Sequence, residues 1–356
     1  MSGDAACFLP NSVLTLIKAK NEFITFEGSV LFADVAGFTP LTESLLILGK
    51  EGSEELTRIV NNYFSEMINI VYNFGGDVLR FAGDAMTILF ENDKGEIALS
   101  SGLEMLEKME KFRRIKTRAG EFNLEMKIGC SFGKVLIGLL DDGKEMDYYA
   151  IGEPLDLSAE AEHHAQRGEI IAEKNILVPD FLSKSLVGEN FFKIQGVPIE
   201  NKKQKNIDTS SNLSSILSKS LPQHLIEMSA TKSIGQHRGV SVLFLSFYLV
   251  KGKEEEVHLE ICNFYMQLKT IANNYGGIVN KLDFGDKGSK ALILFGTPYS
   301  VEKREIMALR CAIDIKENLG NKWQIKVGLT SSHLFSALLG CEKRREFSVM
   351  GDGINL

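Results

Sequence analysis

The sequence predicts an α+β protein in which one β-α-β-β-α-β unit occurs twice. The chain has 356 residues, more than the roughly 100–200 residues usual for one domain. A stretch at 72–90 is repeated at 273–295, with the same Gly-Gly pair, Gly-Asp turn and final Leu-Phe. Within each copy, short apolar stretches typical of strands alternate with segments in which apolar residues recur every three or four positions, as in helices. Together these features indicate a duplicated supersecondary unit.

Shorter matches extend the repeat on both sides of the Gly-Gly pair. They are SVLFAD at 29–34 with SVLFLS at 241–246, KIG at 127–129 with KVG at 326–328, and YYAIGEPLDL at 148–157 with EFSVMGDGINL at 346–356. We therefore expect a first domain at 22–200, a polar linker at 201–237 and a second domain at 238–356. The second copy stops shortly after Gly351, whereas the first continues well past Gly152, which predicts a C-terminally truncated fragment of a longer protein.

The elements of the first copy follow from local signals. Apolar residues at 54–73 recur with the i, i+3, i+4, i+7 spacing of an amphipathic helix, and Gly75-Gly76 ends that helix. The other predicted elements are strands at 29–34, 77–81 and 85–90, a helix at 95–112, and a hairpin with strands at 124–131 and 134–140. The second copy predicts helices near 254–275 and 301–318. This order is that of the ferredoxin-like unit.

Composition excludes several classes of protein. The 40 basic and 47 acidic residues give a net charge of -7, which argues against nucleic-acid binding. The longest nearly apolar run, 240–250, is shorter than the roughly 20 residues of a membrane span. The N-terminus does not have the pattern of a secretory signal. Five scattered cysteines form no metal-binding or disulfide pattern. We therefore expect a soluble cytoplasmic protein.

Two carboxylates stand where they can meet. Asp34 ends an apolar strand and Asp84 lies in a hairpin turn, and in this unit the first strand and the middle hairpin are neighbours. Each residue alone is more often a simple turn or cap residue, but the pair on this frame predicts an Mg²⁺ site, because hard cations prefer oxygen ligands. The next residues, Gly37 and Thr39, indicate a helix N-terminus suited to phosphate, with Thr39 able to cap it.

The second copy lacks this pair, because Ser246 stands where Asp34 stands in the first. One working site built between unlike halves is therefore expected. Another helix, EAEHHAQR at 160–167, is expected to present a solvated face.

Four motifs together carry a family resemblance. They are VLFADVAGFTPLTE at 30–43, FGGDVLRFAGDAMTILF at 74–90, KIGCSFGKVLIG at 127–138 and FSVMGDGINL at 347–356. They resemble the class III nucleotidyl cyclases, and the tandem arrangement is most similar to the soluble adenylyl cyclase family. Diguanylate cyclases have a GGDEF signature, whereas this chain has GGDVL.

The resemblance implies an adenylyl cyclase that converts ATP to cyclic AMP and pyrophosphate. Its two domains pair head to tail within one chain, and Asp34 and Asp84 hold two Mg²⁺ ions, which Mn²⁺ can replace. The implied phosphate-binding residues are Gly37, Phe38, Thr39 and Lys127. In the second half Lys281 and Ser348 read adenine, and Asn355 orients the ribose.

The same resemblance leaves alternatives open. A transition-state arginine is expected four residues after Asn355, beyond Leu356, so a catalytically impaired nucleotide-binding sensor within a larger signalling protein is the rival function. Guanylyl cyclases place Glu and Cys where this chain has Lys281 and Ser348, which favours ATP over GTP.

A second, degenerate site is also implied. It has Asp156 and Glu160 where the working site has asparagine and arginine. Its Arg80 corresponds to Lys281 and takes one of the two basic positions that bind bicarbonate in this family. Ala159 stands at the other basic position, which argues against bicarbonate binding.

Overall fold

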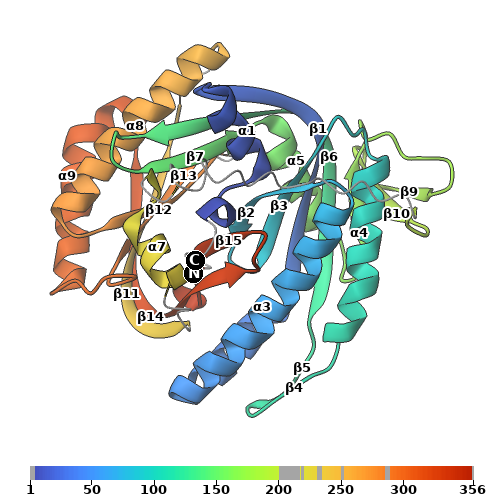
Figure 1. The fold of residues 1–356 in the computed structure, drawn as a ribbon, viewed down its shortest axis with the longest axis horizontal. Helices are drawn as coiled ribbons and strands as arrows, with labels where there is room; N and C mark the ends of the chain where they lie inside the picture. The colour runs from blue at the N-terminus through green and yellow to red at the C-terminus, as the bar shows by residue number, and fades with distance from the viewer. Residues whose placement is uncertain are drawn as a thin grey trace.

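The computed structural model describes residues 5–199, 217, 220–230, 235–249, 252–284 and 289–354. Most of the predicted linker at 201–237 lies outside the described residues, and so does Asn355. The described chain forms two large sheets, each with helices packed beside it (Figure 1).

The first sheet is built around two long strands, β1 (Phe23–Ala36) and β6 (Glu125–Asp141), which pair antiparallel along the whole of β1. On its other edge β1 pairs with β3 (Ala85–Glu91), which forms a hairpin with β2 (Asp77–Ala82). The expectation that the first strand adjoins the middle hairpin is therefore confirmed. Because Ala33 lies opposite Met86, the residues that follow β1 and those that precede β3 lie at the same end of the sheet.

The helix predicted at 54–73 lies within α3 (Gly49–Asn73) and buries the expected apolar stripe against the sheet. Gly75, with φ of 79°, follows its C-terminus as predicted. The helix predicted at 95–112 corresponds to α4 (Glu96–Met109) and a 3₁₀ turn, η2 (Glu110–Phe112). The remaining elements of the first half are α2 (Phe38–Leu46), β4 (Ile115–Thr117), β5 (Gly120–Phe122), β7 (Met146–Ile151), α5 (Glu153–His164), β8 (Ile170–Glu173), β9 (Ser183–Val187) and β10 (Phe191–Gln195).

The predicted hairpin at 124–140 is wrong, because the segment forms the single strand β6. Gly133 adopts φ of 159°, which is extended backbone rather than a turn. Its continuous pairing with β1 leaves no place for a reversal of the chain. The C-terminal part of β6 pairs antiparallel with β7. This strand takes the place of the partner expected within the hairpin.

The second sheet repeats the strand order of the first. Its order is β12-β13-β11-β14-β15, which matches β2-β3-β1-β6 over its first four strands. A register irregularity also recurs at matching places, between Val78 and Arg80 and between Val279 and Lys281. Its elements are β11 (Gln236–Phe247), α8 (Glu254–Asn274), β12 (Ile278–Asp283), β13 (Ser289–Phe295), α9 (Arg304–Trp323), β14 (Lys326–Gly340), β15 (Arg345–Met350) and η3 (Asp352–Ile354), preceded by α7 (Gln223–Ala230).

An N-terminal segment, for which the sequence predicted no helix or strand, packs against both sheets. It comprises η1 (Ala5–Phe8) and α1 (Asn11–Ala19) and is buried in one cluster with apolar side chains from both sheets. The Asp77 carboxylate accepts hydrogen bonds from the first two amides of α1, at 2.8 and 2.7 Å. Arg344, immediately before β15, has no exposed surface and donates to the carbonyl oxygens of Phe8, Val78 and Leu79.

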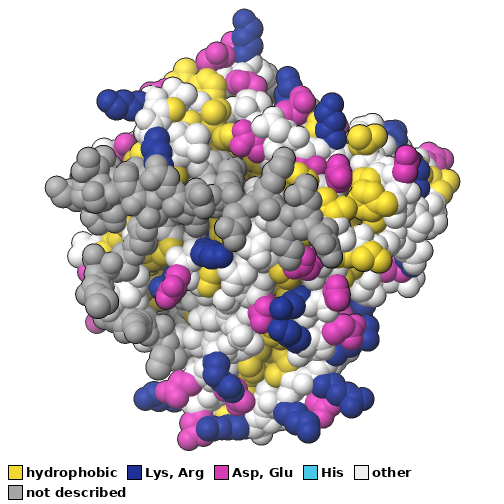
Figure 2. Space-filling view, turned by 45° about the vertical axis from the view of Figure 1, so that its right-hand side comes forward, with side chains coloured by type: hydrophobic (Ala, Val, Ile, Leu, Met, Phe, Trp, Pro, Cys, Tyr) yellow, Lys and Arg dark blue, Asp and Glu magenta, His cyan; other side chains and the backbone are white. Residues whose placement is uncertain are grey.

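The face drawn in Figure 2 carries acidic and basic side chains interspersed with small apolar areas, so charges of one sign do not gather into a stripe there. None of the helices in the described part of the chain is long and apolar enough to cross a membrane.

Candidate active site

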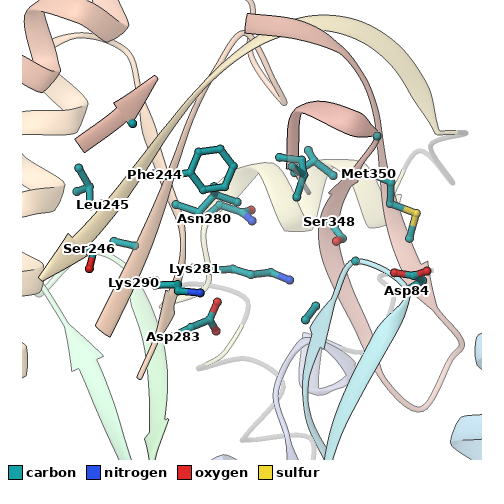
Figure 3. Close-up of a pocket in the computed structure, with 18 of the residues that line it drawn as sticks. Asp84, Phe244, Leu245, Ser246, Asn280, Lys281, Asp283, Lys290, Ser348 and Met350 are labelled. Atoms are coloured by element: carbon teal, nitrogen blue, oxygen red, sulfur yellow. The ribbon is translucent and has the colours of Figure 1, made fainter. Parts of the chain in front are cut away.

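A cavity of about 560 Å³ lies between the two sheets. From the first half its wall includes Phe38, Thr39 and the turn that carries Asp84, and from the second half it includes Lys281 and Ser348. Figure 3 shows Lys281 reaching into the space between β12 and the Asp84 turn, with Ser348 at the far side. The cavity therefore joins sequence-predicted residues from both halves.

The two predicted carboxylates lie close enough to affect one another. Burial, and after it the charge of Asp34, raises the pKa of Asp84 to about 7. Burial, followed by the charge of Glu162, also raises the pKa of Asp34, against the opposing charge of Lys127. Asp84 lines the cavity, whereas Asp34 is not one of its lining residues. Two buried carboxylates that lie close together attract a cation, because its positive charge would offset both negative charges.

The donor set fits a hard divalent cation that shares its ligands with a substrate. Among the described residues, no group of three or more His, Cys, Asp or Glu side chains could hold a metal ion by itself. Mg²⁺ is usually bound by one or two carboxylates, with water and phosphate oxygens completing its coordination. Asp34 and Asp84 match that requirement.

Gly37 begins the segment that the sequence predicts to bind phosphate. It has φ of 97° and is the N-cap of α2, and a Cβ added to it would lie 2.3 Å from the carbonyl oxygen of Asn123. The expectation that Thr39 caps this helix is wrong, because the helix already begins at Phe38 and its cap makes no side-chain hydrogen bond. The amides of Phe38 and Thr39 lie in the first turn and have no partner within the helix, as anion binding requires.

Lys127 lies opposite Asp34 in the ladder between β1 and β6. Its ammonium nitrogen donates to Oε1 of Glu162 at 2.6 Å. Like Asp34, Lys127 is not one of the residues that line the cavity. Glu162 belongs to the helix that was expected to be solvated, but its side chain is only 4% exposed, so that expectation is wrong at this position.

The two residues predicted to read adenine are both buried. Lys281 is 7% exposed and Ser348 2% exposed. The ammonium group of Lys281 donates to the carbonyl oxygen of Phe81 and lies 3.3 Å from Oε1 of Glu346. Although burial opposes it, the charges of Lys281 and Arg344 hold the pKa of Glu346 below its usual value.

Sequence reasoning missed both Glu162 and Glu346. One signal was available for Glu346: it precedes Ser348 by two residues, so both share one face of β15. Glu162 gave no such signal, because its burial depends on how α5 lies against β6.

The residues of the predicted degenerate site line a second cavity, of about 690 Å³, which shares Ala82, Asp283 and Lys290 with the first. Arg80 lines it, but the guanidinium donates to the carbonyl oxygens of Leu282 and Tyr148, at 3.1 and 2.8 Å. Asp156, Ala159 and Glu160 also line this cavity. Acidic residues and Arg80 thus line the same cavity.

The comparisons with known proteins agree with this arrangement. Residues 25–178 match the family described as "Adenylate and Guanylate cyclase catalytic domain". The chain is 25% identical to adenylate cyclase type 10 of Homo sapiens over 93% of its own length, and 24% identical to an adenylate cyclase of Anabaena cylindrica over 53%. It spans 23% of the length of the human relative and 40% of that of the Anabaena relative.

Solved structures that resemble the chain include one that matches most of its length. It is a class III adenylyl cyclase-like ATP-binding protein from Pseudomonas aeruginosa, with a TM-score of 0.59 at 12% sequence identity. The likeness covers 94% of this chain and 80% of that one, so the two share a fold across both halves.

Proposed function

Because the chain belongs to the class III nucleotidyl cyclases, we propose that it converts ATP to 3′,5′-cyclic AMP and pyrophosphate. The proposal is carried by one cavity whose wall combines Asp84, Phe38 and Thr39 with Lys281 and Ser348. A nucleoside triphosphate needs a metal-and-phosphate end and a base-reading end within one enclosed space, and this cavity offers both. We also propose that residues 22–200 and 238–356 are two ferredoxin-like domains packed head to tail.

Asp34 and Asp84 would hold two Mg²⁺ ions together with the phosphates of the substrate. When bound, these ions supply the positive charge that activates the attacking hydroxyl, polarises the α-phosphate and stabilises the leaving pyrophosphate. The need for that charge is supported by the raised pKa of both carboxylates, because burial disfavours their anionic forms.

The protein groups position the substrate. The amides of Phe38 and Thr39 and the ammonium group of Lys127 would bind the β- and γ-phosphates, while Lys281 donates to N1 of adenine and Ser348 accepts from the 6-amino group. The ribose 3′-hydroxyl then attacks the α-phosphorus, and pyrophosphate leaves. Positioning and charge stabilisation provide most of the rate enhancement in such a reaction.

A second candidate, a nucleotide sensor without turnover, has one observation in its favour. The ammonium group of Lys281 already donates to Phe81 and is paired with Glu346, which leaves one of its three donors for adenine and ties the lysine to the protein. The sensor would bind ATP with the same residues and form no product.

Product identification separates the two functions. The chain is incubated with ATP or with GTP in Mg²⁺ or Mn²⁺, and products are identified by mass spectrometry. We expect cyclic AMP from ATP, its loss in Asp84→Ala, and no loss in Asp180→Ala, which removes an exposed aspartate away from the cavity. ATP binding without product would instead support the sensor, and cyclic GMP as the main product would contradict the proposed base preference.

A further inference from the structure

The absence of a side chain at Gly129 allows the helix α5 to pack directly against β6. A Cβ added to Gly129 would lie 1.8 Å from the carbonyl oxygen of Ser158 and 2.4 Å from the amide nitrogen of Glu162. No side chain fits between the helix and the strand at this point. The backbone of Glu162 is therefore fixed beside β6, close to Lys127.

From this position Glu162 forms a short, partly buried ion pair with Lys127. Its Oε1 lies 2.6 Å from the lysine nitrogen, and the carboxylate is 4% exposed while the lysine side chain is 22% exposed. Its Oε2 lies 3.5 Å from Nδ1 of His163, a residue whose side chain is 69% exposed. A carboxylate so enclosed cannot replace its lysine partner with water, because an unpaired buried charge is costly.

The geometry leaves Lys127 able to serve a second anion. An ammonium group has three donors, and the contact with Glu162 uses one of them. Because Glu162 contacts this ammonium group, an anion bound by Lys127 would also lie near the negative charge of Glu162, which would oppose its binding.

We infer that Glu162 is a positioning residue for phosphate binding: its carboxylate fixes the ammonium group of Lys127 and weakens the hold of that group on a triphosphate. Release of pyrophosphate then does not require the lysine to move. The inference rests on the proposed function, because it takes Lys127 to be a phosphate ligand.

The test measures binding of inorganic tripolyphosphate, with Mg²⁺ present, by isothermal titration calorimetry. Glu162→Gln keeps the shape and removes the charge, so we expect tripolyphosphate to bind about tenfold more tightly. Glu153→Gln is the matched control: it removes the same charge from an exposed position at the start of the same helix, outside both cavities, and little change is expected.

A double-mutant cycle shows whether the effect passes through the lysine. In a Lys127→Met background, Glu162→Gln is expected to change binding by less than twofold. An equal gain with and without Lys127 would overturn the inference, because the effect would then be a general charge effect. Unchanged binding in Glu162→Gln, or no tripolyphosphate binding by the unaltered chain, would also overturn it.

Kinetics give a second readout that a purely structural role would not move. Glu162→Gln should lower both KM for ATP and kcat, because substrate and pyrophosphate are both held more tightly; a raised KM would contradict the inference. If Glu162→Gln fails to fold, Glu162→Asp is used in the same cycle, with a smaller gain expected. Coupled tripolyphosphate binding without cyclic AMP formation would defeat the proposed function and leave the inference standing.

Discussion

At the residue scale, the most informative group is Asp84. Its pKa is raised from 3.8 to about 7, first by burial and then by the charge of Asp34. Between these values the folded protein binds more protons than the unfolded chain, so this group makes the free energy of unfolding fall as the pH rises. The metal-free site is therefore electrostatically unfavourable at neutral pH.

Removing this charge should stabilise the metal-free protein. We expect Asp84→Asn to raise the free energy of unfolding at pH 8 by about 1–3 kcal/mol and to have little effect at pH 4. Urea denaturation without metal, at both pH values, measures this. Asp180→Asn serves as the control on an exposed residue. An unchanged or reduced stability at pH 8 would contradict the account.

Gly37 supports a second prediction at this scale. Alanine there would have to adopt φ of 97° and would meet the carbonyl oxygen of Asn123 at 2.3 Å. We expect Gly37→Ala to cost about 2 kcal/mol or more and to weaken tripolyphosphate binding. Gly188→Ala is the matched control, since Gly188 has φ of 68° but no atom within 4 Å of the added Cβ. An equal loss of stability in the two variants would show that close packing at Gly37 is unimportant.

At the element scale, local patterns predicted some elements better than others. The stripe of α3 and the β2–β3 hairpin follow from periodicity and turn residues, and the structure contains both. The error at 124–140 arose because Phe132-Gly133 has the composition of a turn. Long-range pairing with β1 overrides that local preference, and a sequence read in short windows does not contain the pairing.

The duplicated unit offers a matched pair of glycines for testing how the elements pack. Gly129 of KIG contacts α5, whereas a Cβ on its counterpart Gly328 of KVG would meet only the Cβ of Phe244, at 3.9 Å. We expect Gly129→Ala to destabilise the protein by about 2–4 kcal/mol and Gly328→Ala by less than about 1 kcal/mol. Urea denaturation of both variants measures the difference. Similar costs would contradict the packing described for α5.

At the scale of the whole molecule, the two halves are joined by buried charges. Arg344 donates to Phe8, Val78 and Leu79, and its guanidinium also contacts Glu346 at 3.0 Å. These bonds link the N-terminal segment, the first sheet and the second sheet. The sequence could not have revealed them, because the partners Phe8 and Arg344 lie 336 residues apart.

Loss of this link should destabilise the molecule. Arg344→Met leaves buried carbonyl oxygens and the Glu346 carboxylate short of partners, so we expect a cost of about 3–5 kcal/mol. Arg345→Met, at the adjacent half-buried position, is the control and should cost less than about 1 kcal/mol. Thermal and urea denaturation measure both. A cost for Arg344→Met no larger than that of the control would argue against the proposed fastening.

The sequence predicted part of the candidate site, because local motifs contain several of its residues. Motifs identified Asp84, Phe38, Thr39, Lys281 and Ser348, and the structure places all of them around one cavity. The partners Glu162 and Glu346 were not predicted, because each depends on the position of an element that only the folded chain defines. Asn355 lies outside the described residues, and its role stays a prediction.

The central claim is that residues from both halves serve one site. The most direct test is the initial rate of cyclic AMP formation from ATP by the unaltered chain, by Asp84→Asn and by Lys281→Met. The account predicts product from the unaltered chain and a loss on the order of 100-fold or more in each variant, with both variants folded. A folded unaltered chain that forms no cyclic AMP in Mg²⁺ or Mn²⁺, or a Lys281→Met variant that keeps the full rate, would contradict it.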